Sequence, residues 1–528
     1  MRVAFVLHGH LPWVRGHGTH PCGEEWLFQS WAETYLPLLA VLERLAEEGA
    51  RDVLTLGLTP VLAEQMEDPR LLADFHGWLG RRPLDLAHTV SRYGQSDRDR
   101  LRPTWAAHWR HLQWLLARFE AGPARTGLVA PLRDLADAGV IQLLGGPPAH
   151  PYLPLIDRPE VLQAHLADGM ARSSRALGRR PAGVWTPECG YRPAGTVADP
   201  TVPAREHAPG GAPVLARGEA ELPGLEQAWA HAGADHLVLD GPTLVRGEPL
   251  EGRSRAPHAA TDHPVRVGDG DLVAYGRNLA LSYAVWSPEG GYPGDPWYRD
   301  FHAIDLEGGF KSWRVTDQAA LAKEPYDPEA AAQRVTAHVE DFLARCSAHA
   351  EQARAHASDE EPPIAVAAFD AELFGHWWHE GPAWLEATLR ALRSAPHLST
   401  TTLAGDRARR STPQRLALPE SSWGAGKGHA AWVSPATHQL WARLRAAEGA
   451  WAALPTGERR TVAWRQLALA EASDWPFLIN RDQSRQYAHE RVDGHLEDLA
   501  AAAQGRDLAA LTARDDPAGA VITSLASG

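Results

Sequence analysis

Short apolar runs alternate with segments of helical periodicity along residues 2–369 of the chain. The runs are continuously apolar, which is typical of strands buried on both faces of a sheet. The segments between them place apolar residues at helical spacing over 30–50, 159–177, near 222–232 and over 328–355. This alternation predicts an α/β fold whose parallel sheet is covered by helices, and it is compatible with a barrel. The expected strands are 2–8, 52–60, 140–146, 183–188, 235–240, 271–278 and 363–369.

Side chains that can take part in catalysis or binding follow the ends of these expected strands. Catalytic groups of parallel α/β barrels lie at the carboxyl ends of the strands. The shared position of these residues therefore indicates one common site more strongly than any single residue does. They are His8, His10, His150, Glu188, Arg277 and Asp370.

The chain changes character after about residue 406, where Ala- and Leu-rich segments with helical spacing predict a helical C-terminal domain. The Pro/Gly/Ala-rich stretch 193–215 reads as an excursion from the sheet, and 241–268 has no clear period and is expected to be a long loop. No internal repeat with a fixed period is present.

With 528 residues, the chain exceeds what one hydrophobic core usually fills, which favours one large domain and a smaller one. The formal net charge of -14 argues against nucleic-acid binding, which needs clustered Lys and Arg.

The isolated cysteines Cys22, Cys189 and Cys346 fit a reducing cytoplasm. The apolar run at the start is too short for a signal segment or a membrane span, so no membrane partner is expected. The count of 21 Trp, against 10 Tyr and 10 Phe, indicates flat aromatic surface at a binding site as well as core packing.

The pair His8 and His10 in "LHGHLP" projects both rings from one face of an extended segment. Such a pair can be metal ligands of a zinc hydrolase, can bind substrate hydroxyls, or can be satisfied histidines at a strand end. The spacing alone leaves all three interpretations open.

Two acidic motifs follow apolar strands. Glu188 lies in "VWTPECGY" between Trp185 and Tyr191, which can lower the local dielectric constant. Asp370 ends the apolar run of "AAFDAELFGHWWHEG", where an unpaired carboxylate would be costly, so it is expected to be paired or functional. Glu372 is the alternative to Asp370 in this motif.

Aromatic and polar residues recur together in three further motifs. They are His150 in "LLGGPPAHPYLPLI", Trp423 and Trp432 in "ESSWGAGKGHAAW", and Asp474 with Trp475 in "EASDWPFL". Aromatic rings stack on the apolar faces of sugars while carboxylates and histidines bind their hydroxyls. A purely structural role for these tryptophans is the alternative.

Taken in order, these motifs resemble glycoside hydrolase family 57, and within it the 1,4-α-glucan branching enzymes. The matching segments are "HGHLP", "GGPPAHPYLP", "WTPECGY", "YGRNLALSYAVWSPEGGYPG", "SWRVTDQ", "FDAELFGHWW", "SSWGAGKGHAAW" and "ASDWPFL". Each motif is weak alone, but their common order over more than 450 residues is specific.

The resemblance implies an incomplete (β/α)7 barrel, a small helical insertion and an all-helical C-terminal domain that completes the active-site cleft. It implies a barrel over 1–192 and 236–405, an inserted helical region over 193–235 and the C-terminal domain over 406–528. The implied partner is an α-glucan such as amylose or glycogen, which serves as donor and acceptor. No metal and no cofactor are implied.

Carried over residue by residue, the resemblance implies Glu188 as nucleophile and Asp370 as general acid/base. It implies substrate contacts at Arg277, Gly294, Trp423 and Asp474, and cleft-lining positions at His10, His150, Trp26, Trp286 and Trp432. Glu372 matches the motif but not the catalytic position. Trp423 and Trp432 are further expected to form an acceptor platform and a lid against solvent.

A branching reaction breaks an α-1,4 bond and forms an α-1,6 bond, so the anomeric configuration is retained. Retention requires a nucleophilic carboxylate and a second carboxyl group that acts first as acid and then as base. We therefore expect Glu188 to be held ionised by hydrogen bonds, with Arg277 nearby. We expect burial and the charge of Glu188 to keep Asp370 protonated.

One departure from the family bears on the activity. Branching enzymes carry a tyrosine at the tip of a loop over the cleft, and the corresponding segment, 241–268, contains none. An α-amylase or 4-α-glucanotransferase on the same fold is therefore an alternative. A zinc-dependent deacetylase or α-mannosidase-like hydrolase using His8 and His10, and a glycogen-binding protein without activity, are more distant alternatives.

Overall fold

The structure is a computed structural model that describes residues 1–19, 22–203, 206–207, 213–250, 260–287, 290–317, 320, 322–354, 361–411 and 413–519. Seven parallel strands form its centre. They are β1 (Arg2–Gly9), β2 (Leu54–Leu58), β3 (Ile141–Leu144), β4 (Gly183–Trp185), β9 (His236–Leu239), β12 (Val273–Gly276) and β13 (Ile364–Asp370).

These seven strands close into a ring. One sheet contains the order β13-β1-β2-β3, and the second contains β12-β9-β4. Two single parallel bridges, Gly145 to Val184 and Arg277 to Val366, join the two sheets at their edges. The ring order is therefore β1-β2-β3-β4-β9-β12-β13, which confirms the predicted incomplete (β/α)7 barrel with two seams of minimal pairing.

The interior of the barrel is filled by alternate side chains of its strands. Ala4 and Val6 of β1 meet Val366 and Ala368 of β13 inside the ring, together with Tyr275 of β12. The intervening residues of β1, Val3, Phe5 and Leu7, point outward into the core under the helices. Both faces of each strand are buried, which explains the continuous apolar runs in the sequence.

Helices lie outside the ring between successive strands. They are α1 (Glu24–Ser30), the π-helix η1 (Trp31–Tyr35), α2 (Leu36–Glu47), α3 (Pro60–Met66), α4 (Pro69–Arg92), α5 (Gln95–Ala121), α6 (Val129–Asp137), α7 (Pro159–Leu177), α8 (Leu225–His231), α9 (Gly241–Val245), α10 (Leu279–Val285), α11 (Pro328–Arg354), α12 (Gly381–Ser394) and α13 (Leu403–Arg407). Short 3-10 helices are η2 (Pro123–Arg125), η3 (Leu153–Leu155), η4 (Pro187–Cys189), η6 (Tyr292–Gly294), η7 (Ala371–Leu373) and η8 (Ala425–Lys427). The helices expected over 159–177, near 222–232 and over 328–355 correspond to α7, α8 and α11.

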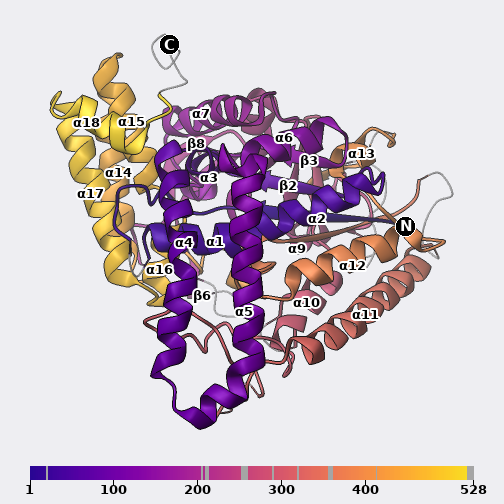
Figure 1. Ribbon diagram of the computed structural model, residues 1–528. Coiled ribbons are helices and arrows are strands. Elements are labelled where there is room, and N and C mark those ends of the chain that lie inside the picture. Colours follow the sequence, from indigo (N-terminus) through magenta and orange to yellow (C-terminus); the bar gives the residue numbers. More distant parts are fainter. Residues whose placement is uncertain are drawn as a thin grey trace.

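The long helices α4 and α5 run side by side as a hairpin that projects beyond the barrel (Figure 1). At about 1.5 Å per residue each spans roughly 35–40 Å. Asp68 caps α4 by accepting hydrogen bonds from the backbone N–H groups of Arg70 and Leu71. The hairpin forms an outer wall over α2 and has no counterpart among the elements expected from the sequence.

Several short strands lie outside the ring. They are β5 (Gly195–Asp199), β6 (Glu206–His207), β7 (Pro213–Val214), β8 (Ala216–Leu222), β10 (Glu248–Pro249), β11 (Val265–Val267), β14 (Ser399–Thr400) and β15 (Arg415–Ala417). The expectation of a helical insertion over 193–235 is wrong for its first part, because β5 pairs antiparallel with β8 and β6 with β7, and among the described residues of this range only α8 is an α-helix. The expected loop over 241–268 contains α9, β10 and β11, while residues 251–259 lie outside the described residues.

The C-terminal part is mainly helical, as expected. It contains α14 (His438–Ala452), α15 (Glu458–Ala470), α16 (Asp474–Arg481), α17 (Arg485–Ala503) and α18 (Leu508–Asp515). These helices gather at one end of the barrel (Figure 1). The sheet also reaches past residue 406, because β15 pairs with β11 and β10. Among the described residues, no helix is long and apolar enough to cross a membrane.

Candidate active site

The carboxyl ends of the barrel strands bring the predicted site residues to one place. Asp370 is the last residue of β13 and pairs in register with His8 of β1. His10 follows the end of β1, and Glu188 follows β4 in the 3-10 helix η4. The charge of Glu188 raises the pKa of Asp370, so the two carboxyl groups lie within electrostatic reach of each other. The site thus forms at the barrel end that the strand pattern predicted.

Glu188 is held in a strained turn. Its φ of 61° is left-handed, a conformation that non-glycine residues adopt at a cost of about 1–3 kcal/mol and that clusters at functional sites. The backbone carbonyl of Glu188 accepts a hydrogen bond from Trp423 N at 2.9 Å, and Tyr191 and Ser421 exchange backbone hydrogen bonds beside it. The segment that carries Ser421 and Trp423 is therefore hydrogen-bonded to the turn at both Glu188 and Tyr191.

Two donors bind the carboxylate of Glu188. The indole Nε1–H of Trp423 donates to Oε2 at 2.6 Å, and the hydroxyl of Ser473 donates to Oε1 at 2.8 Å. Burial raises the pKa of Glu188 to about 7, while these two hydrogen bonds act in the opposite direction. The hydrogen bonds expected for Glu188 therefore come from Trp423 and Ser473, and no hydrogen bond from Arg277 accompanies them.

Three stacked histidines lie beside this carboxylate. His8 Nε2 is 2.9 Å from His150 Nε2, and His150 Nδ1 is 2.8 Å from Ser473 Oγ. Burial lowers the pKa of both His8 and His150 well below the usual value, so both rings are neutral. When Glu188 is ionised, the Ser473 hydroxyl must donate to it and accept from His150, which in turn accepts from His8. All three hydrogen bonds are then donated in the same direction, from the buried His8 through His150 and Ser473 to the carboxylate of Glu188.

His10 occupies a different position in the same layer. Its ring stacks on His150 with centroids 3.9 Å apart, and its Nε2 lies 2.9 Å from Asp474 Oδ2. Its Nδ1 contacts Thr59 Oγ1 at 3.1 Å. The expected positions of His10, His150 and Asp474 at one site are thus brought together by contacts between the barrel and α16.

Asp370 has surroundings unlike those of Glu188. Among the described residues, no side chain or backbone group donates a hydrogen bond to its carboxyl group. Burial, and next the charge of Glu188, raise the pKa of Asp370 to about 7, against the lowering effect of His10 and Arg277. The expected direction of this shift is confirmed. A buried carboxyl group without donors is better suited to carry a proton than to stay charged.

Glu372 does not share a face with Asp370, because β13 ends at Asp370 and the chain turns into η7. The buried carboxyl group of Glu372 accepts hydrogen bonds from the Tyr35 hydroxyl and from the backbone N–H of His10. Burial raises the pKa of Glu372 to about 8. Glu372 thus supports the loop that carries His10 instead of facing the catalytic pair.

The turn after this motif depends on Gly375. Its φ is 120°, and a Cβ atom there would lie 1.8 Å from the carbonyl oxygen of Glu33. The next residue, His376, contacts Glu33 Oε2 through Nδ1 at 2.8 Å. Trp378 is buried in the core, whereas Trp377 stacks on Trp286 with centroids 5.9 Å apart. The two consecutive indoles therefore have separate roles.

Arg277 is buried and paired. Its guanidinium group binds Asp240 at 2.8 Å and lies over the Trp423 ring, 5.3 Å from its centroid. Lys427 also binds Asp240, at 2.9 Å. Arg277 therefore supports the ring that donates to Glu188 and acts on the catalytic pair through its charge.

The predicted cleft-lining tryptophans differ in exposure. Trp286 is 47% exposed, which suits a binding surface, and Trp26 of α1 is partly buried against the core. Trp432 is only 1% exposed and stacks on Tyr152 at 4.2 Å, and its side chain acts to lower the pKa of Glu188, so its role as an acceptor platform stays a prediction. Trp423 is engaged with Glu188 and Arg277. Gly294 lies in η6, where its N–H bonds to Gly291 O within the same turn, and its contact with substrate stays a prediction.

The comparison with known sequences identifies the family. The profile of glycosyl hydrolase family 57 matches residues 4–417, which is most of the chain. The chain belongs to glycosyl hydrolase family 57. A second profile, described as the C-terminal part of 1,4-alpha-glucan branching enzyme, matches residues 444–513. This second region covers α14–α18.

Similar members of family 57 cover nearly the same length. A probable 1,4-alpha-glucan branching enzyme of Mycobacterium tuberculosis is 36% identical over 518 residues, covering 93% of this chain and 89% of that protein. A 1,4-alpha-glucan branching enzyme of Thermococcus kodakarensis is 34% identical over 515 residues, covering 94% and 72%. The crystal structure of a branching enzyme of this family from Pyrococcus horikoshii superposes with a TM-score of 0.86 at 31% identity, over 98% of this chain and 94% of that one.

Ser473 and Tyr35 are two residues of this family-57 site that the sequence motifs did not single out. Ser473 stands next to Asp474 in "EASDWPFL", and its adjacency to an expected substrate contact was the available signal. Tyr35 lies in the π-helix η1, and a π-helical turn often marks a functional site. Only the structure reveals what either hydroxyl contacts.

One group of side chains bears on the zinc hypothesis. His10, His150 and Asp474 could each offer a ligand atom, and these atoms lie within 4.8 Å of one another. His8, the residue expected to pair with His10 as a ligand, is not in this group, because its Nε2 faces His150. In the structure, protein partners already engage the three groups.

Proposed function

We propose that this chain is a retaining 1,4-α-glucan branching enzyme that uses Glu188 as nucleophile and Asp370 as general acid/base. The observation that carries the proposal is that two neighbouring, half-buried carboxyl groups have different hydrogen-bond partners in a chain that belongs to family 57. Two hydrogen-bond donors stabilise the charge on Glu188. Burial and the charge of Glu188 raise the pKa of Asp370, which favours its protonated form. The match of the C-terminal region to branching enzymes supports the specific activity.

In the first step, Glu188 attacks the anomeric carbon of an α-1,4-linked glucosyl unit. Asp370 donates its proton to the departing glycosidic oxygen, and a glycosyl-enzyme ester forms. Loss of the charge on Glu188 as the ester forms removes the main electrostatic cause that raises the pKa of Asp370 after burial. Asp370 is then ready to act as a base.

In the second step, the 6-hydroxyl of an acceptor glucan replaces the leaving group. Asp370 removes the hydroxyl proton, the oxygen attacks the anomeric carbon, and the ester bond to Glu188 breaks. The product carries an α-1,6 branch. Transfer requires that the sugar hydroxyl reaches the intermediate before water does. We propose that Trp286 and Trp377, which stack on each other, contribute to the acceptor side.

The donor and acceptor we propose are α-glucans such as amylose and glycogen. We also propose that the enzyme works in the cytoplasm, since Cys22, Cys189 and Cys346 are free thiols in the structure. We propose that catalysis needs no metal. Dialysis against a chelator should therefore leave the activity unchanged, whereas a loss that zinc restores would favour a metal at His10, His150 and Asp474.

An α-amylase or 4-α-glucanotransferase activity is the second candidate, because 241–268 lacks the tyrosine that branching enzymes carry over the cleft. If that residue normally shields the intermediate, water competes better in this protein. The expected consequence is a higher share of hydrolysis. It does not alter the roles proposed for the two carboxyl groups.

The deciding experiment incubates the purified chain with amylose. The α-1,6 linkages formed are counted by debranching, and new reducing ends are counted in the same samples. Branch points in excess of new reducing ends support the proposal. Reducing ends without branch points would identify a hydrolase, and new α-1,4 chain lengths alone would identify a glucanotransferase.

A further inference from the structure

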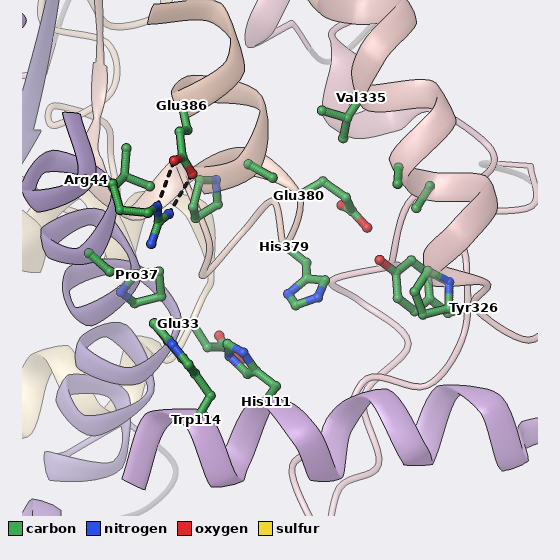
Figure 2. A pocket seen from close by; sticks show the side chains of 17 residues that line it. Glu33, Pro37, Arg44, His111, Trp114, Tyr326, Val335, His379, Glu380 and Glu386 are labelled. Atoms are coloured by element: carbon green, nitrogen blue, oxygen red, sulfur yellow. Dashed lines mark hydrogen bonds and ion pairs between the residues drawn. The ribbon is translucent and has the colours of Figure 1, made fainter. Parts of the chain in front are cut away.

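A cavity of about 410 Å³ lies on the outer wall of the barrel, away from the catalytic pair. It is enclosed by α2, α5, α11 and α12, and by the residues just before α11 and α12 (Figure 2). Its size falls in the range of ~300–1,000 Å³ typical of small-molecule sites. None of its lining residues is Glu188, Asp370 or a hydrogen-bond partner of Glu188.

One wall of the cavity is aromatic. Trp114 of α5 is 38% exposed and stacks on His111, with centroids 5.7 Å apart. His379 contacts the rings of both His111 and Tyr326 edge-to-face at 5.9 Å. Figure 2 shows the two imidazoles in the middle of the cavity, with Trp114 on one side and Tyr326 on the other. Alanine and proline side chains of α2, α11 and α12 supply apolar surface around them.

Hydrogen-bonding groups converge on this cavity. Glu380 is 6% exposed; its Oε1 accepts from the N–H of Arg299, and the Tyr326 side chain, which also lines the cavity, acts against burial to lower the pKa of this carboxyl group. Among the described residues, neither His111 nor His379 forms a hydrogen bond. Burial lowers the pKa of His111 to about 4 and lowers that of His379 well below its ordinary value, so each neutral ring offers one donor and one acceptor.

The charged groups around the cavity favour an uncharged ligand over an anion or a cation. The Arg44 guanidinium at the rim is bound by both oxygens of Glu386, at 2.8 and 2.6 Å, and is not free for an anion. Glu33 is matched by Lys311 and His376, and so gives little attraction for a cation. A neutral ligand with apolar faces and a rim of hydroxyl groups fits an aromatic wall with convergent donors and acceptors.

We propose that this cavity is a second carbohydrate site that binds one or two glucosyl units of an α-glucan chain. A sugar ring would stack on Trp114 and direct its hydroxyl groups to His111, His379 and Glu380. The identity of the sugar rests on the proposed function, since the chain would act on α-glucans. The site would hold a polymer to the enzyme without taking part in the reaction.

The test uses Asp370→Asn enzyme, so that the ligand is not consumed, and calorimetric titration with maltoheptaose. The expected result is two sites in this protein, and one site after the added change Trp114→Ala. The matched control is Trp109→Ala, because Trp109 lies on the same helix, is 47% exposed and does not line the cavity. Binding at the outer site should weaken by at least about tenfold on loss of Trp114, as for a central aromatic contact.

The outcomes separate this proposal from the proposed function. A single site that Trp114→Ala leaves unchanged overturns the second site and leaves the branching proposal intact. Absence of glucan binding in every variant overturns both. In otherwise unmodified enzyme, Trp114→Ala should raise the KM for amylopectin while kcat on short maltooligosaccharides stays unchanged.

A second measurement does not depend on whether the Trp114→Ala variant folds. Limited oxidation of tryptophan by N-bromosuccinimide, followed by peptide mapping, reports the reactivity of each indole in the Asp370→Asn protein. Maltotriose should slow the oxidation of Trp114 and leave that of Trp109 unchanged. Equal rates with and without maltotriose at Trp114 overturn the proposal.

Discussion

The surroundings of the two carboxyl groups differ although both lie at the same end of the barrel. Glu188 is reached by groups from distant parts of the chain, the indole of Trp423 and the hydroxyl of Ser473. Asp370 sits at the end of β13 beside β1, and among the described residues it receives no donor. The pKa of both groups is raised to about 7, with burial as the largest cause, so the two groups differ in their hydrogen-bond donors and not in the size of this pKa shift.

The largest expected effect comes from removing either carboxyl group. Glu188→Gln and Asp370→Asn should each lower kcat on amylose by at least ~10³-fold, the scale of losing a catalytic group. The two variants should differ in their release of fluoride from α-maltotriosyl fluoride, whose leaving group needs no proton. Asp370→Asn should then release a burst of fluoride of about one equivalent, because the ester still forms and its transfer lacks a base.

Glu188→Gln should release no burst with the same fluoride. A burst in both variants, or in neither, would contradict the assignment of nucleophile and acid/base. Thermal unfolding of both variants checks that the lost activity does not reflect lost structure.

The next effect is expected from Trp423→Phe, which keeps an aromatic ring under Arg277 and removes the N–H that binds Glu188. A hydrogen bond to a charged group is worth about 1.5–3 kcal/mol, so kcat/KM should fall by roughly 10–100-fold. Steady-state kinetics on amylose measures it. Trp451→Phe is the matched control, because it removes one buried indole hydrogen bond, to Arg460 O at 3.1 Å, between α14 and α15 of the C-terminal part. Equal losses in the two variants would show that packing, not the donor, matters.

A smaller change is expected from Ser473→Ala, since water can replace a small hydroxyl group. Loss of this donor disfavours the ionised form of Glu188 and raises its pKa. The acidic limb of the kcat/KM profile should therefore move to higher pH by up to about one unit, with a rate loss of roughly tenfold at low pH. Ser174→Ala, which removes a hydroxyl bond to Met170 O on α7, should leave the profile unchanged. An unshifted acidic limb in Ser473→Ala would show that Ser473 does not stabilise the ionised form of Glu188.

The same contrast explains what could be predicted from the sequence. Asp370 and Glu188 follow apolar strands, and all seven barrel strands were expected because burial on both faces leaves continuous apolar runs. The donors Ser473 and Trp423 lie 285 and 235 positions from Glu188. No local pattern encodes such contacts, so Ser473 was missed and Trp423 was expected to be a platform. The strands β5 and β8 were missed for a related reason: they are short and mostly exposed or half-buried, and their few buried residues do not alternate regularly.

The last expected effect is on stability and not on the rate, and it concerns the Asp370 side, where Glu372 supports His10. Its pKa of about 8 in the folded protein lies above the ordinary value of 4.5, so the folded state binds the extra proton between these two values. The stabilisation from this proton is complete below pH 4.5 and is lost as the pH rises through about 8. Glutamine resembles the protonated carboxyl group, and its carbonyl oxygen can accept from both Tyr35 and His10, as Oε1 of Glu372 does.

Glu372→Gln should therefore reduce the fall in unfolding free energy between about pH 5 and about pH 8.5, by an amount of the order of a few kcal/mol. Urea unfolding at the two pH values measures this difference. Glu351→Gln on the exposed face of α11 is the control, and it should retain the fall seen in the unaltered protein. If Glu372→Gln loses as much stability over this range as the unaltered chain, the proton does not reside on Glu372. The support of His10 would then depend on an ionised carboxylate, and the Asp370 side would resemble the Glu188 side more closely than its contacts indicate.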